Sequence, residues 1–145
     1  MVDMLIVDTN VWLDAADVDC PNHQACARLL LDRRADLATP AVVIAEAARL
    51  IRFKLGAAAE ARYVKLVTSP AVEIIDLAPD DWARAVELIE TYLDRPLGLV
   101  DAAIVAAAER LNVTDLATMN GRDFYLVRPR HTTAFTLLPE GLARP

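Results

Sequence analysis

Short apolar segments rich in branched residues alternate along the chain with longer segments whose apolar positions have helical spacing. The short segments predict buried strands over residues 4–7, 37–38, 72–77, 116–118 and 134–138. The longer segments predict helices over residues 21–34, 40–51, 57–68, 79–93 and 99–111. Turns are expected at residues 8–10, 95–98 and 120–121.

Two of the predicted helices carry clear start signals. Thr39 and Pro40 place a cap and a first-turn proline ahead of one helix, and Pro79 opens another. Strands separated by helical patterns of about 10 to 15 residues indicate crossover connections. We therefore predict the α/β class, with a mostly parallel sheet covered by helices on both faces. Ligands of such sheets gather at the carboxyl ends of the strands, so residues that directly follow strands are the first candidates for chemistry.

Length and composition describe one folded unit. The chain has 145 residues, of which 55% are hydrophobic and 25% charged, so we expect one domain over residues 1–145. No apolar run reaches the ~18 residues that span a bilayer, and Asp3 stands where an export signal carries positive charge. We therefore expect a cytoplasmic protein with no membrane partner. The net charge of −6 argues against a protein that binds nucleic acid mainly by neutralising its phosphates with basic residues. It is compatible with a nuclease that has an acidic metal pocket.

Four carboxylates are candidates for chemistry, and each also has a structural interpretation. Asp8 and Asp123 follow predicted strands, where an Asp can equally cap a helix. Glu46 lies within an apolar helical segment, where a buried carboxylate needs a partner such as Arg49. Asp101 stands near the start of an alanine-rich helix, where the helix dipole favours a carboxylate.

Placed together at the carboxyl edge of one sheet, these four acids predict a cation site. Like charges about 5 Å apart cost about 3 kcal/mol at an effective dielectric of about 20, so a fold keeps such a cluster when a cation binds it. All-oxygen ligands favour hard ions, so Mg²⁺ is expected, with Mn²⁺ as the alternative. A second group, Cys20, His23 and Cys26, is similar in spacing to a soft-metal site but offers no fourth ligand, and free thiols are the alternative.

Four segments resemble the PIN domain family, and in particular its VapC-type toxins. They are residues 6–11, 39–46, 98–106 and 116–124, so the resemblance follows nearly the whole chain in order. It implies a single PIN domain with a three-layer α/β/α sandwich around a central, mostly parallel sheet. By position, Asp8, Glu46 and Asp101 match three acids of the family's metal site.

The fourth acid is where the sequence departs from the family pattern. Many relatives carry an acid at the position of Asn120 and another just before the Phe, which here is Asp123. The resemblance therefore implies Asp8, Glu46, Asp101 and Asp123 as metal ligands and catalytic residues. It leaves open whether Asn120 or Asp123 completes the site, and whether one ion binds or two.

Polar neighbours of the acids match supporting positions of the family. They are Thr9, Asn10, Thr118 and Asn120. Asn10 is expected to hold the Asp8 carboxylate or a metal-bound water. The densest basic stretch follows the fourth segment and supplies candidates for contacts with RNA phosphates, namely Arg122, Arg128 and Arg130. The structural alternative for the polar neighbours is a role in turns and helix caps. The structural alternative for the arginines is a solvated basic loop.

The function implied by the resemblance is that of a metal-dependent endoribonuclease toxin. Such a toxin hydrolyses tRNA, rRNA or mRNA, blocks translation and is neutralised by a cognate VapB-type antitoxin, and a homodimer is the expected assembly. The alternative is a catalytically silent PIN-like domain that binds RNA or a protein. Two other classes are disfavoured, because Asn10 stands where a haloacid-dehalogenase-like phosphatase needs a second Asp, and the last lysine, Lys65, comes too early for a phospho-receiver domain.

Overall fold

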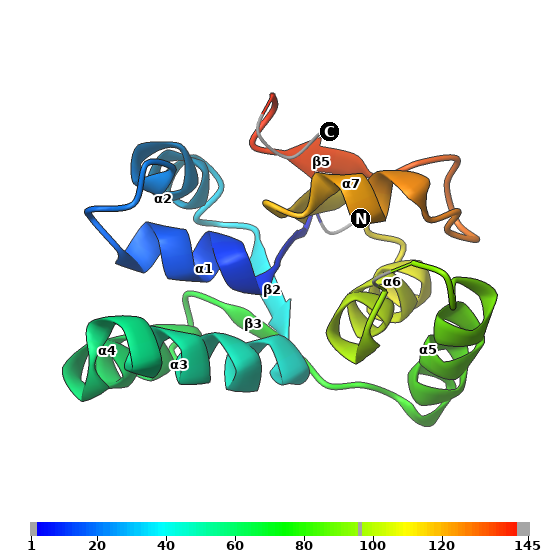
Figure 1. The fold of residues 1–145 in the computed structure, drawn as a ribbon, viewed down its shortest axis with the longest axis horizontal. Helices are drawn as coiled ribbons and strands as arrows, with labels where there is room; N and C mark the ends of the chain where they lie inside the picture. The colour runs from blue at the N-terminus through cyan, green and yellow to red at the C-terminus, as the bar shows by residue number, and fades with distance from the viewer. Residues whose placement is uncertain (1–2, 96, 142–145) are drawn as a thin grey trace.

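Five short parallel strands form the centre of the fold (Figure 1). The structure, a computed structural model, describes residues 3–95 and 97–141. Its strands are β1 (Leu5–Val7), β2 (Leu37–Pro40), β3 (Glu73–Ile75), β4 (Asp115–Ala117) and β5 (Thr136–Leu138). They lie in the order β3-β2-β1-β4-β5, and each neighbouring pair is parallel. The predicted α/β class is confirmed.

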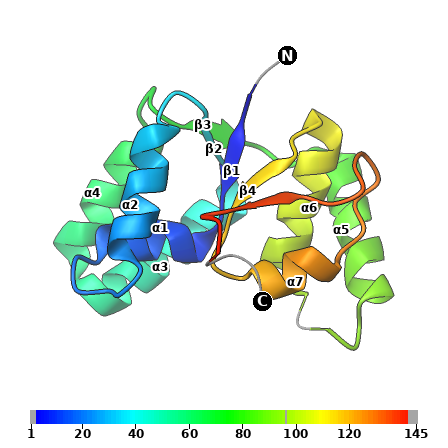
Figure 2. The same cartoon turned by 90° about the horizontal axis from the view of Figure 1, so that it is seen from above.

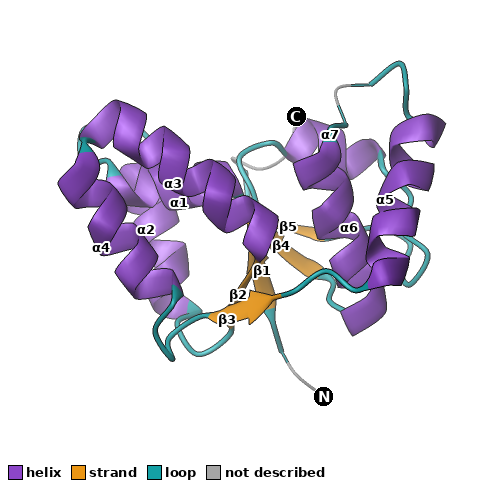
Figure 3. Cartoon of the chain, turned by 90° about the horizontal axis from the view of Figure 1, so that it is seen from below, coloured by secondary structure: helices purple, strands orange, loops and turns teal. Residues whose placement is uncertain are grey.

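Helices cover both faces of this sheet and complete a three-layer α/β/α sandwich (Figures 2 and 3). The helices on one side are α1 (Thr9–Ala16), α2 (His23–Asp32), α3 (Ala41–Leu55) and α4 (Ala57–Val67). On the other side lie α5 (Pro79–Thr91), α6 (Leu99–Leu111) and α7 (Gly121–Leu126). None of the helices in the described part of the chain combines the length and the apolarity that a membrane crossing requires.

The strand order creates a switch point at the carboxyl edge of the sheet. From β1 the chain proceeds to β2 and β3 on one side, and then returns through α5 and α6 to β4 and β5 on the other side. β1 and β4 are therefore paired neighbours whose connections lead in opposite directions, which is where open α/β sheets bind their ligands. Asp8 follows β1 and Thr118 follows β4, so both stand at this point.

The apolar core lies on both faces of the central strands. All three residues of β1 are fully buried, as expected for a parallel strand covered by helices on both sides. Helix α6 is buried over residues 102–108, directly after Asp101. This run contains Ile104, Val105 and five alanines, whose small side chains allow close packing on every side of the helix. The first turn of α6 is therefore attached to a rigid support.

The predicted turn at residues 8–10 is wrong, because α1 begins at Thr9 directly after β1. The Asp8 side chain accepts a hydrogen bond from the backbone N–H of Thr9 at 2.7 Å and caps the helix. Val11 and Trp12 lie on the buried face of α1. Turns and helix caps use the same local bond from a short polar side chain to the backbone, so the sequence signal of Asp-Thr-Asn fits both.

The predicted turn at residues 120–121 is also wrong, because α7 begins at Gly121. Asp123 therefore lies in the first turn of a short helix rather than at a strand end. The strands predicted over 72–77 and 134–138 shorten to Glu73–Ile75 and Thr136–Leu138. One residue of the predicted break at 95–98, Pro96, lies outside the described residues.

The junction between β2 and α3 is shifted from its predicted position. Thr39 and Pro40 are the last residues of β2, and α3 begins at Ala41 with Pro40 in the capping position. The proline has φ −65° and ψ 148°, an extended conformation that ends a strand as readily as it precedes a helix. In the same way, α2 begins at His23 rather than at residue 21.

Tyr63 of α4 carries a buried hydroxyl that has no hydrogen-bond partner among the described residues. Its ring packs edge-on against Trp12, with centroids 5.5 Å apart, and burial raises the pKa of the hydroxyl. A buried polar group without a partner costs about 1–3 kcal/mol. We therefore expect Tyr63→Phe to raise the free energy of unfolding by about 1 kcal/mol, measured by urea denaturation.

Tyr92→Phe is the matched control for this prediction. The Tyr92 hydroxyl accepts a hydrogen bond from the backbone N–H of Arg128 at 3.0 Å. Its removal should lower the free energy of unfolding by about 1 kcal/mol, because it leaves that N–H without its partner. A similar loss of stability in both variants would show that the Tyr63 hydroxyl does make a stabilising hydrogen bond.

Candidate active site

Asp8 is fixed at the carboxyl end of β1 by two hydrogen bonds. The residue is 5% exposed, and its Oδ1 and Oδ2 accept from the backbone N–H of Thr9 at 2.7 Å and from the hydroxyl of Thr118 at 2.9 Å. Burial raises the pKa of Asp8, the two hydrogen bonds oppose the rise, and the charge of Glu46 adds to it. The carboxylate therefore has one defined orientation at the switch point.

The hydroxyl of Thr118 is itself oriented by a second bond. Its Oγ1 accepts the backbone N–H of Asn120 at 2.9 Å, while its hydrogen is donated to Asp8. The start of α7 is thus tied to the acid at the end of β1. Asn10 is exposed, and in the described part of the chain its side chain makes no hydrogen bond to the Asp8 carboxylate, so the first of its two expected roles is wrong. Its other expected role, holding a metal-bound water, stays a prediction.

Glu46 stands on the exposed side of α3, and the prediction that it lies among core residues is wrong. Val43 and Ala47 take the buried face of the helix instead. The Glu46 Oε1 accepts the hydroxyl of Thr9 at 2.6 Å, which links α3 to the first turn of α1. Arg49, the alternative partner, is exposed and forms no ion pair with Glu46 among the described residues.

Asp101 lies half-buried in the first turn of α6. Burial is the main cause that raises the pKa of Asp101 to about 7, and the negative charges of Asp8, Asp123 and Glu46 contribute to the rise. Asp8, Glu46 and Asp123 are therefore all close enough to Asp101 for their charges to act on it. The four acids come from the position that follows β1 and from α3, α6 and α7.

These groups border a polar pocket of about 470 Å³ at the switch point of the sheet. Its lining residues are Asp8, Thr9, Asn10, Glu46, Gly98, Leu99, Val100, Asp101 and Asn120. Asn120 thus belongs to the pocket wall, whereas Asp123 lies outside the lining and acts on Asp101 through its charge. Leu99 and Val100 were not predicted as site residues, although their place directly before Asp101 in the chain is a signal that indicates them.

The donor atoms of the pocket fit a hard divalent cation. They are carboxylate, amide and hydroxyl oxygens, which Mg²⁺ and Mn²⁺ prefer, and the charges of Asp8, Asp123 and Glu46 add to the rise in the pKa of Asp101 that burial causes. In the described ranges no three His, Cys, Asp or Glu side chains already converge on one ion position.

Cys20, His23 and Cys26 do not form a metal site in the described part of the chain. Cys26 is buried, its Sγ lies 3.8 Å from the Sδ of Met119, and burial raises the pKa of its thiol to about 11. The Nδ1 of His23 lies 3.1 Å from the carbonyl oxygen of Asp14. Both cysteines are free thiols.

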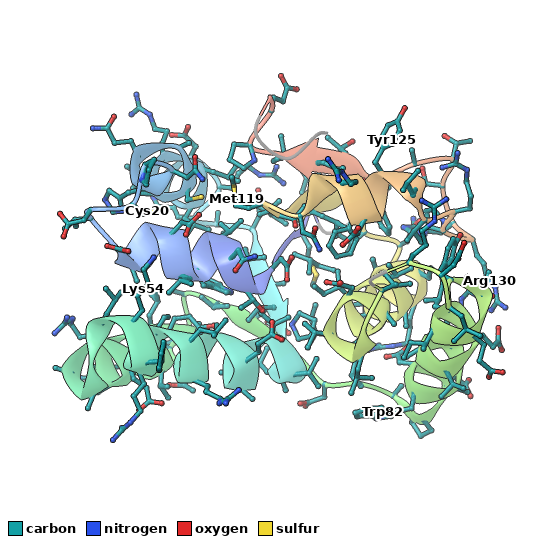
Figure 4. All side chains as sticks on the ribbon, in the orientation of Figure 1. Cys20, Lys54, Trp82, Met119, Tyr125 and Arg130 are labelled. Atoms are coloured by element: carbon teal, nitrogen blue, oxygen red, sulfur yellow. The ribbon has the colours of Figure 1, made fainter. Side chains whose placement is uncertain are left out.

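The three arginines predicted to contact RNA do not gather at the pocket. Arg130 pairs with Glu87 at 2.8 Å, and Figure 4 places it beside α5, away from α1 and α3. Arg128 donates to the backbone carbonyl of Tyr125 at 3.2 Å. Arg122 is exposed in the first turn of α7. The structure thus favours an ion-paired surface role for Arg130 and leaves Arg122 as the strongest of the three candidates.

The comparison with protein families decides which family this arrangement represents. A model of the PIN domain matches residues 5–128, a range that contains all four acids. The chain belongs to the PIN domain family. This PIN domain is 29% identical over 136 residues to Ribonuclease VapC26 of Mycobacterium tuberculosis, a match that covers 93% of this chain and 100% of the relative.

Two solved structures share the fold of this PIN domain. Mycobacterium tuberculosis VapC20, a sarcin-ricin loop cleaving toxin, has a TM-score of 0.73 and 20% identity over 77% of this chain and 86% of its own. A toxin-antitoxin complex from Klebsiella pneumoniae has a TM-score of 0.67 and 22% identity over 91% of this chain and 99% of its own. The predicted three-layer architecture is therefore confirmed.

The raised pKa of Asp101 makes the stability of this PIN domain depend on pH. Between the ordinary value of 3.8 and about 7, the folded state holds a proton that the unfolded state has lost, so the free energy of unfolding falls as the pH rises. Asp101→Asn removes this effect. In EDTA, we expect the variant to be more stable than the parent at pH 8 by up to about 4 kcal/mol, measured by urea denaturation.

Asp80→Asn controls for the loss of an acid in the first turn of a helix, because Asp80 is exposed in the first turn of α5. This variant still contains Asp101, so its free energy of unfolding should fall between pH 4 and about 7, as in the parent. If Asp101→Asn also kept the parental slope, the pKa of Asp101 would not be raised and the account of the pocket's charge would be wrong.

Proposed function

We propose that this PIN domain is a metal-dependent endoribonuclease toxin that hydrolyses RNA, blocks translation and is neutralised by a cognate VapB-type antitoxin. The observation that carries the proposal is the pocket at the switch point, where Asp8, Glu46 and Asp101 share one cavity. The relative named as a ribonuclease, which matches over its full length, supports the activity. The toxin-antitoxin complex with the same fold supports the kind of partner.

The proposed ion is Mg²⁺, with Mn²⁺ as the alternative, held by Asp8, Glu46 and Asp101 with Asp123 or Asn120 as the fourth ligand. A divalent cation in such a set supplies activation of water and stabilisation of charge at the phosphate. The chain contributes oriented oxygens, because hydroxyl groups and a backbone N–H already hold the carboxylates of Asp8 and Glu46. It contributes no histidine base, since both histidines contact backbone carbonyls outside the pocket.

We expect the antitoxin on the helical layer formed by α1, α2 and α4. An apolar pocket of about 360 Å³ lies between these helices, lined by Trp12, Ala15, Ala16, Ala27, Leu30, Ala59, Arg62, Tyr63 and Leu66. Apolar surface of this kind marks contacts with other proteins. The exposed guanidinium of Arg62 offers a charge-assisted contact to an acidic residue of the partner. Helix α1 carries residues of both this pocket and the acidic one.

A homodimer is proposed from the apolar surface on the other side of the sheet. Figure 4 shows Trp82 on α5. Trp82 and Val86 of α5 are 46% and 54% exposed, and Leu93, just after the helix, is 77% exposed. Trp82 and Val86 are four residues apart and therefore lie on one face of α5, and Leu93 follows the end of this helix. A second copy of the chain packed on this face would remove them from water.

The purified protein, free of antitoxin, should cleave cellular RNA at discrete sites with Mg²⁺ or Mn²⁺, and EDTA should abolish the cleavage. We expect Asp8→Asn and Asp101→Asn to lower kcat by at least about 100-fold, because each removes a charged ligand of the ion. If Asp123 completes the site, Asp123→Asn should weaken Mn²⁺ binding by about tenfold or more. Gel analysis of the products and calorimetry of metal binding measure the two effects.

Glu90→Gln, which changes an exposed acid of α5, is the matched control and should retain parental cleavage. Cleavage that survives Asp8→Asn would point to another site or to a contaminating nuclease. Absence of cleavage with every metal, together with absence of Mg²⁺ binding by the parent, would favour the alternative function, a catalytically silent PIN-like domain that binds RNA or a protein.

Leu66→Glu should weaken the complex with the cognate antitoxin by about 100-fold while RNA cleavage by the free protein stays unchanged. Leu66 is 43% exposed and lines the apolar pocket, so the substitution would place a charge where the partner removes water. Calorimetry with purified antitoxin measures the affinity. Phe53→Glu, at a 91% exposed apolar residue outside the pocket lining, is the control, and equal losses in both variants would refute this docking position.

A further inference from the structure

The hydrogen-bond ladder between β1 and β2 stops one step short of the end of β1. The Leu5 N–H donates to the Asp36 carbonyl at 2.9 Å, and the paired register ends with Ile6 opposite Ala38. In a parallel ladder the donors of one strand recur at every second residue, so the donor for the Val7 carbonyl would be the N–H of residue 40. That residue is proline, which has no N–H.

The side chain of Thr39 replaces the missing backbone donor. Its Oγ1 donates to the Val7 carbonyl at 2.9 Å and accepts the indole N–H of Trp12 at 3.3 Å. Thr39 is 0% exposed, so water does not compete for either bond. Because the indole N–H occupies an acceptor position of the hydroxyl, the hydroxyl hydrogen is directed to the carbonyl of Val7.

The bond from Thr39 acts on the peptide unit that leads into Asp8. The Val7 carbonyl and the Asp8 N–H belong to one planar peptide, and this N–H donates to the Ala117 carbonyl of β4 at 2.8 Å. One edge of the peptide is therefore held by the backbone of β4 and the other by the side chain of Thr39. We propose that Thr39 is a positioning residue for Asp8 and that Trp12 orients its hydroxyl.

This inference rests on the proposed function, because it takes Asp8 as a residue of the active site. Thr39 is fully buried and does not line the acidic pocket, so it has no route to the substrate. Its effect on the reaction must pass through the backbone at Asp8. The expected signature is a loss in kcat without a change in KM, together with a local loosening of the Val7–Asp8 peptide.

The test compares Thr39→Val, which keeps the shape but removes the hydroxyl, with Thr39→Ser, which keeps the hydroxyl. With RNA substrate and Mg²⁺, Thr39→Val should lower kcat by about 10-fold or more, with KM unchanged, and Thr39→Ser should recover kcat to within about threefold of the parent. By amide hydrogen exchange without metal, the Asp8 N–H should exchange at least about tenfold faster in Thr39→Val than in Thr39→Ser.

Ile51→Val is the matched control for loss of stability alone. Ile51 is 0% exposed in α3 and is not among the residues that line the acidic pocket, so its truncation should weaken the core and leave kcat and Asp8 exchange unchanged. Trp12→Phe removes the indole donor while keeping an aromatic ring. It should lower kcat and accelerate Asp8 exchange in the same direction as Thr39→Val, by a smaller factor.

The outcomes separate this inference from the proposed function. Parental kcat and parental Asp8 exchange in Thr39→Val, with an active parent, would overturn the positioning role alone. Equal losses in Thr39→Val and Thr39→Ser would also overturn it, because the hydroxyl would then not be the group that matters. A parent that neither cleaves RNA nor binds Mg²⁺ would overturn the proposed function, while the exchange measurement would still decide whether Thr39 holds the peptide.

Discussion

The negative charge that Asp8, Glu46 and Asp123 place around the half-buried Asp101 is the constraint that shapes the carboxyl edge of this sheet. Burial removes the Asp101 carboxylate from water, which is the larger cost, and the like charges of the neighbouring acids add to it. Burial, and with it the charges of the three acidic neighbours, raises the pKa of Asp101 to about 7, so the hydrogen bonds and helix ends around the site offset this cost only in part. The folded state therefore keeps these negative charges together at a cost in stability, and a bound cation would lower that cost.

Helix ends and hydrogen bonds supply the partial compensation. Asp8 caps α1, Asp101 lies in the first turn of α6 and Asp123 in the first turn of α7, so three of the acids lie where helix dipoles favour negative charge. Asp8 receives two hydrogen bonds and Glu46 receives one. The structural role of capping and the proposed chemical role are therefore not alternatives for Asp8. The same bond that starts the helix also fixes the orientation of the carboxylate.

The sequence predicted the class of the fold better than the local path of the chain around the acids. Branched apolar runs and helical spacing indicated the parallel sheet, because buried strands and covering helices leave periodic signals. Helix α1 was missed because the residues at its start serve turns and caps alike. Glu46 was expected in the core because its neighbours are apolar, yet several of them are small residues that tolerate exposure. The surroundings of Arg130 could not be predicted, since its partner, Glu87, lies on a distant segment.

The junction of β2 and α3 shows how the fold and the site constrain each other. Pro40 ends β2 in an extended conformation and stands directly before α3, the helix that carries Glu46. The same proline removes the donor that would hold the end of β1, where Asp8 begins. Thr39 restores that bond with a buried hydroxyl, so two adjacent residues link the placement of two acids that belong to different elements. A substitution at either position acts on the pocket through the backbone, although neither side chain lines it.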